Sequence, residues 1–119
     1  MSLVTDIYGK KFGDFKKGYG EALKWTEEFR KYNFSSKGME KLRNDCGEFF
    51  SKNIVQLKEA TDQDDYDYGA AGHDYWLTRN GHGAGFWDRD LGKVGDELTK
   101  ACEYTEVHAF LIDKKIHME

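Results

Sequence analysis

The chain has 119 residues, the size of one domain that buries a single core without metal or disulfide staples, so we expect one domain over residues 1–119. Charged residues of both signs are mixed along the chain and leave a net charge of -4, which excludes the basic surface of a nucleic-acid-binding protein. Aromatic residues make up 15% of the chain and supply the large buried area that a disordered chain lacks.

Apolar residues at helical spacing predict two N-terminal helices that pack as an antiparallel pair. The first spans about 14–32, although Gly18 and Gly20 weaken its beginning by about 1 kcal/mol each relative to alanine. The second spans about 36–60, with Ser35 or Ser36 as its N-cap. The two apolar stripes consist of Phe15, Tyr19, Ala22, Leu23, Thr26 and Phe29, and of Met39, Leu42, Cys46, Phe50, Ile54 and Leu57.

The pattern changes after residue 60. Residues 61–72 lack periodicity and are rich in Asp, Tyr and Gly, which is typical of a solvated connection. The next segment begins with residues of high β propensity, continues into the glycine-rich run 80–83 and ends in further aromatics. This order predicts a β-hairpin over 73–88 with a glycine-rich tip.

A third helix and a second hairpin complete the expected order. The helix spans about 91–104 and is capped by Asp88 or Asp90. A strand over 107–112 then turns into a short edge strand that ends at Met118.

We therefore expect an α+β fold in the order α-α-β-β-α-β-β. A two-helix N-terminal hairpin should pack on an antiparallel sheet of two β-hairpins with a connecting helix, because neither layer can bury its apolar face alone. Trp76 or Trp87 should lie between the two layers.

The two cysteines, Cys46 and Cys102, fall on apolar stripes of predicted helices, which favours buried free thiols over a disulfide. No window approaches a transmembrane span, and the N-terminus lacks the apolar segment of a signal peptide. We therefore expect a cytoplasmic protein with no membrane partner.

Residues 70–90 hold the strongest functional signal, because His, Arg, Asn and aromatic side chains crowd there among four glycines. In the predicted hairpin, Arg79 and His82 flank exposed backbone N–H groups that could receive a phosphate or carboxylate. The alternative is a tight hairpin that needs glycine for its geometry, with Arg79 paired to Asp88 or Asp74. The candidate binding residues are His73, Asp74, Thr78, Arg79, Asn80, His82, Trp87 and Asp88.

Metal and nucleophilic chemistry find little support in the spacing. The His and Asp residues of this segment match no recognised metal pattern, and the acidic run 62–67 fails as a calcium loop because Asp67 stands where glycine is required. We therefore expect no metal and no cofactor. General acid–base work by His73 or His82 is easier to support, since imidazole titrates near neutral pH.

The string GHDYWLTRNGHGAGFWDRDLGKVGDELT, over about residues 72–99, resembles a motif of small proteins of unknown function encoded by bacteriophages and other mobile elements, in which Phe is often found in place of Tyr75. The resemblance leaves out the N-terminal helices. It implies a phage-type origin and expression in a bacterial cytoplasm. It also implies that the matched residues form a shared core or site.

These observations predict a small accessory binding module that contacts a host protein or a small anionic ligand through 73–88. The alternative is an enzyme that acts on a phosphate-bearing or nucleotide substrate, which requires Arg79, His82 and Asp88 to converge. If Arg79 serves a ligand, Arg79→Ala should destabilise the fold much less than truncation of a buried tryptophan.

Overall fold

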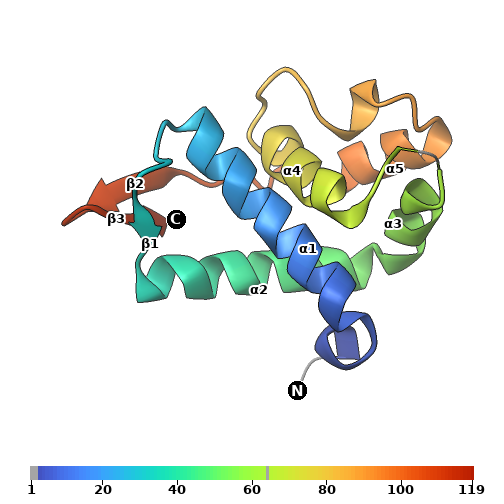
Figure 1. Ribbon diagram of the computed structural model, residues 1–119. Helices are drawn as coiled ribbons and strands as arrows, with labels where there is room; N and C mark the ends of the chain where they lie inside the picture. The colour runs from blue at the N-terminus through green and yellow to red at the C-terminus, as the bar shows by residue number, and fades with distance from the viewer. Residues whose placement is uncertain (1–2, 64) are drawn as a thin grey trace.

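The computed structural model describes residues 3–63 and 65–119, with side chains from residue 8 onward. Helix α1 runs diagonally across the molecule with α2 below it, the sheet at one end, and α3 and α5 at the other (Figure 1). The elements are α1 (Leu3–Thr26), β1 (Asn33–Phe34), α2 (Ser36–Lys52), α3 (Ile54–Thr61), α4 (Tyr68–Arg79), the 3-10 helix η1 (Phe86–Asp88), α5 (Lys93–Ala101), β2 (Ala109–Ile112) and β3 (Lys115–Met118).

The fold is mostly helical, with one small sheet of mixed direction, so the expected α-α-β-β-α-β-β order is wrong. The error lies in the predicted hairpin over 73–88, where the structure has helix α4, a loop and η1. None of the helices in the described part of the chain has the length and apolar content to cross a membrane.

Helix α4 forms because both of its sides are buried, which outweighs the β propensity of its aromatic residues. Asp67 caps its N-terminus by accepting a hydrogen bond from the backbone N–H of Ala70. Six of its eight buried positions repeat along one face at the spacing of a helix: Tyr68, Ala71, Gly72, Tyr75, Trp76 and Arg79. The other two, Asp74 and Leu77, lie on another side of the helix. The predicted connection over 61–72 therefore ends at Asp67.

The predicted N-terminal helices exist, with altered bounds. Helix α1 begins at Leu3 and ends at Thr26, rather than spanning 14–32. The predicted N-cap Ser35 is confirmed, since its hydroxyl accepts a hydrogen bond from the N–H of Gly38 at 2.8 Å. The second helix breaks at Asn53, whose side chain donates to the carbonyl of Phe49, so 36–60 becomes α2 and α3. The third helix is shorter than predicted and follows Gly92 instead of an aspartate cap.

Helices α1 and α4 approach each other so closely that their backbones touch at glycine. A Cβ on Gly72 would lie 1.9 Å from the carbonyl oxygen of Phe15, and one on Gly18 would lie 2.0 Å from that of Gly69. Next to this contact, Trp76 packs edge-on against Tyr19 with ring centroids 5.4 Å apart and is almost fully buried. Trp76 therefore lies between two helices, and not between helices and a sheet.

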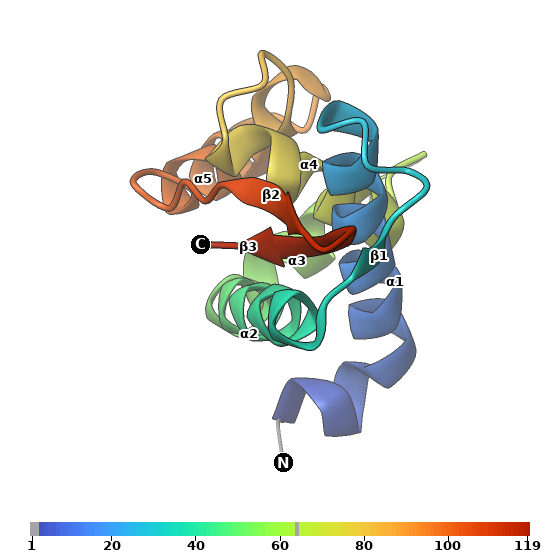
Figure 2. The same ribbon diagram turned by 90° about the vertical axis from the view of Figure 1, so that its left-hand side faces the viewer.

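The C-terminal hairpin is confirmed, because β2 and β3 pair antiparallel across a turn in which Asp113 and Lys114 both have positive φ. Strand β3 is nevertheless the central strand and not an edge strand. It pairs on its other side with β1, a parallel two-residue strand that the sequence did not predict (Figure 2). The sheet covers the beginning of α2, where Ser35 also donates to the carbonyl of Ile116.

Both cysteines are free and buried, as predicted. Burial raises the pKa of the Cys102 thiol to about 12 and that of the Cys46 thiol well above its ordinary value. Reaction with thiol reagents needs the thiolate, so both positions are unreactive in the folded chain at neutral pH.

The raised thiol pKa values predict that the protein loses stability in alkali. Above about pH 9 the unfolded chain releases thiol protons that the folded chain retains, so the free energy of unfolding should fall as pH rises toward 12. Denaturant titrations at a series of pH values measure this slope, and Cys102→Ala should make it shallower. A free energy of unfolding that stays constant or rises above pH 9 would contradict the prediction.

Candidate functional site

The eight candidate residues of 73–88 do not all converge on one pocket. Helix α4 carries His73, Asp74, Thr78 and Arg79, and the others lie in the loop and in η1. Their side chains face in different directions because successive helical residues are about 100° apart. The segment therefore serves several contacts at once.

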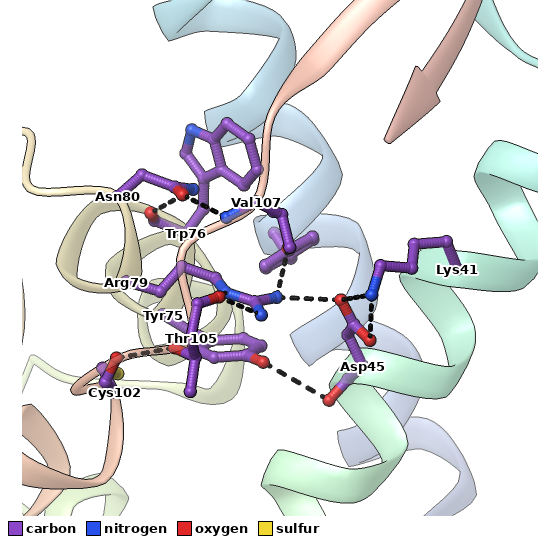
Figure 3. Close-up of polar contacts among 10 residues, drawn as sticks. Lys41, Asp45, Tyr75, Trp76, Arg79, Asn80, Cys102, Thr105 and Val107 are labelled. Atoms are coloured by element: carbon purple, nitrogen blue, oxygen red, sulfur yellow. Dashed lines mark hydrogen bonds and ion pairs between the residues drawn. The ribbon is translucent and has the colours of Figure 1, made fainter. Parts of the chain in front are cut away.

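Arg79 lies inside the molecule, with only 6% of its side chain exposed. Its guanidinium donates to the carbonyl of Thr105, to the hydroxyl of Tyr19 at 2.9 Å and to the carboxylate of Asp45 at 3.0 Å (Figure 3). It also lies over the ring of Tyr75, 4.8 Å from the centroid. This arrangement occupies the guanidinium with internal partners.

The charge of Arg79 is maintained by its neighbours. Burial by itself would lower its pKa, but Tyr19, Tyr75 and Asp45 together raise the pKa above its ordinary value. Asp45 is also paired with Lys41 at 3.2 Å. The predicted alternatives, Asp74 and Asp88, are engaged elsewhere, so Arg79 joins α4 to α1, to α2 and to the loop after α5.

The loop over 102–107 is held by Arg79 and Asn80. Arg79 donates two hydrogen bonds to the carbonyl of Thr105, one from Nε at 2.8 Å and one from Nη2. The side-chain oxygen of Asn80 accepts from the N–H of Val107 at 3.0 Å, and its amide donates to the carbonyl of Trp76 (Figure 3). These two residues thus fix the backbone at Thr105 and Val107, directly after Tyr104.

Asp74 is buried in a second polar cluster. Its carboxylate accepts from Arg89, with the closest contact at 2.9 Å, and from the hydroxyl of Tyr66 at 2.8 Å. Burial and the adjacent Asp74 both raise the pKa of Tyr66, so this hydroxyl stays protonated and continues to donate. His73 lies beside the cluster and lines an open cleft of about 540 Å³ together with Asp74 and Arg89.

The loop after α4 is organised by its own side chains. The hydroxyl of Thr78 accepts from the N–H of Phe86, and Asp88 accepts from the N–H of Gly85. His82 stacks on Trp76, with centroids 6.2 Å apart, and lies 3.9 Å from the carboxylate of Glu27. His73 and His82 therefore line two different pockets.

One groove does gather residues of the motif at the surface. It has a volume of about 440 Å³, and two exposed aromatic rings line it, Trp87 at 52% and Tyr104 at 100% exposure. The candidate residues Thr78, Arg79 and Asn80 contribute to its lining, and Glu103 and Glu106 give it negative charge. The sequence did not point to Tyr104, because a helix was expected over residues 91–104 with Tyr104 at its end.

Catalytic and metal geometries are not assembled by the described side chains. Arg79, His82 and Asp88 each contact different groups, so the convergence that the enzyme alternative requires is not seen. Within residues 8–63 and 65–119, no cluster of three or more His, Cys, Asp or Glu side chains could hold a metal ion. Comparison with protein-family models, curated proteins and solved structures finds no match for the chain.

Proposed function

We propose that the protein is a binding module that recognises a partner protein through the groove between Trp87 and Tyr104. The observation that carries the proposal is that two exposed aromatic rings, Trp87 and Tyr104, line one groove beside the end of α4. Tryptophan and tyrosine are the residues that most often supply the energy of a protein interface. Most other aromatic rings of this chain are buried in the core.

The backbone at Tyr104 supports a role in binding. Its φ is 62°, a left-handed conformation that costs an ordinary L-residue about 1–2 kcal/mol. The full exposure of the ring means that no packing in the chain itself compensates for that cost. Among the described non-glycine residues with positive φ, Tyr104 is the one with an aromatic ring, a bulky side chain that rarely adopts this conformation.

The charge of the groove favours one class of partner. Glu103 and Glu106 lie in its lining, while the guanidinium of Arg79 is occupied by Asp45, Tyr19 and Thr105. An anionic ligand would meet net negative charge there. A partner segment that presents Lys or Arg would pair with the glutamates and could lie over the indole of Trp87. The resemblance to phage-encoded proteins points to a protein of the bacterial host as this partner.

Tyr104→Gly should stabilise the fold while it removes a binding side chain. Glycine adopts positive φ without penalty, so the free energy of unfolding should increase by about 1 kcal/mol. Glu28→Gly is the matched control, because Glu28 is also exposed at a φ of 60° and lies away from the groove. Denaturant unfolding measures both, and a clear loss of stability in Tyr104→Gly alone would show that the ring serves the fold.

The binding test compares wild type with Trp87→Ala, Tyr104→Gly and Trp25→Ala. Trp25 is 63% exposed and outside the groove, which makes it the matched control for loss of a surface tryptophan. A protein captured from bacterial lysate by wild type and by Trp25→Ala should bind each groove variant at least about tenfold more weakly once purified. Equal binding by all four proteins would overturn the proposal.

A further inference from the structure

A second groove lies between α1, β1 and the beginning of α2, away from the residues of the proposed interface. Its volume is about 430 Å³. Apolar residues line much of it, and basic side chains surround them. The apolar lining consists of Gly20, Phe34, Met39 and Leu42, and the charged residues are Lys16, Lys17, Lys24, Arg43 and Glu21.

The hollow results from a glycine that faces two apolar side chains. A Cβ on Gly20 would lie 3.6 Å from both Phe34 and Leu42, so the missing side chain leaves open space above them. Met39 continues the apolar surface of α2 and remains 39% exposed, although its position in the sequence predicts a core residue. The groove is therefore an apolar surface that the chain itself does not cover in the described residues.

The charges around this apolar surface are unbalanced. Four basic residues face a single acidic one, Glu21, in a chain whose net charge is -4. Among the ion pairs of the described residues, none involves Lys16, Lys17, Lys24 or Arg43. Lys24 instead lies over the ring of Phe34, with its Nζ 5.4 Å from the centroid. The positive charge is thus available to a ligand.

We propose that this groove binds a medium-chain fatty acid, with the alkyl chain on Phe34, Met39 and Leu42 and the carboxylate among Lys24, Arg43 and the neighbouring lysines. The volume lies within the range of small-molecule sites, about 300–1,000 Å³, which combine an apolar lining with a few placed polar groups. An uncharged apolar ligand would leave the basic side chains without an anionic partner. A nucleic acid would not use the apolar floor.

The test titrates the protein with dodecanoate below its micelle concentration and follows binding by calorimetry. Decanoate should bind about tenfold more weakly, because each buried methylene contributes about 0.8 kcal/mol. Dodecyltrimethylammonium, which has the same chain and a positive head group, should not bind. The double variant Lys24→Gln/Arg43→Gln should weaken dodecanoate at least about tenfold, and Met39→Glu, which places an anion on the exposed part of the floor, should weaken it as strongly.

Lys37→Gln/Lys93→Gln is the matched control, because both lysines are exposed and neither lines the groove. This variant should bind dodecanoate like wild type. Absence of saturable dodecanoate binding, equal binding of the cationic analogue, or an equal loss in the control variant would each overturn the proposal. Concentration-dependent dimers in sedimentation without dodecanoate binding would also overturn it, since a second copy of the chain would then cover the groove.

Discussion

Arg79→Ala should destabilise the protein by about 3–5 kcal/mol, a large share of the roughly 5–15 kcal/mol that holds a domain together. The substitution removes a buried cation and leaves the hydroxyl of Tyr19, the carboxylate of Asp45 and the carbonyl of Thr105 without their main partner. This expectation reverses the small effect predicted from the sequence, where Arg79 was placed at an exposed hairpin tip. Denaturant unfolding with a linear extrapolation measures the loss.

Two controls identify the cause of that loss. Arg79→Lys keeps the charge but cannot donate from a planar fork to Thr105 and Asp45 together, so it should recover only part of the stability. Arg30→Ala removes an exposed arginine that lies over the ring of Trp25, and it should cost less than about 1 kcal/mol. If Arg79→Ala proves as mild as Arg30→Ala, the buried network does not stabilise the fold.

Gly72→Ala should destabilise the protein by about 3 kcal/mol, in spite of the higher helix propensity of alanine. The new Cβ would lie 1.9 Å from the carbonyl oxygen of Phe15, and both groups belong to packed helices, so α1 and α4 must move apart. Gly18→Ala should behave in the same way, because its Cβ would meet the carbonyl of Gly69 at 2.0 Å. Thermal and denaturant unfolding both report the change.

Gly13→Ala is the matched control, because Gly13 lies on α1 together with Gly18. No atom lies within 4 Å of its Cβ position, so alanine should increase stability by about 0.5–1 kcal/mol through helix propensity alone. The double variant Gly18→Ala/Gly72→Ala should lose less than the sum of the single losses, since one separation of the helices relieves both contacts. Strictly additive losses would contradict a shared helix contact.

The N-terminal half of the fold was largely predictable because its signals are local. The apolar repeat of α2 and its cap at Ser35 lie within a few turns of chain, whereas the break at Asn53 was not predicted. The turn at Asp113 and Lys114 is equally local and joins β2 to β3 as predicted. By contrast, β1 has only two residues and exists because β3 is there to pair with it.

Helix α4 shows where local propensity misleads. Tyr75, Trp76 and Thr78 favour a strand, yet the helical repeat from Tyr68 through Gly72 to Arg79 was present in the sequence. Two residues of this repeat, Gly72 and Arg79, are not apolar, so the repeat does not look like the apolar stripe of a core helix. Their burial depends on distant parts of the chain: the backbone of α1 at Phe15 packs against Gly72, and Asp45 of α2 pairs with Arg79.

The sequence by itself indicated that residues 70–90 carry unusual residues, that Trp76 or Trp87 belongs to a core, and that Cys46 and Cys102 are buried thiols. The structure buries Trp76 and both thiols and leaves Trp87 exposed. Only the tertiary structure decided that Arg79 faces inward to Asp45, and that Trp87 shares a groove with Tyr104. The physical reason is that residue type specifies what a side chain can bind, whereas its partner depends on which helices pack against it. Propensities of about 1 kcal/mol are overruled when such packing buries a whole helix.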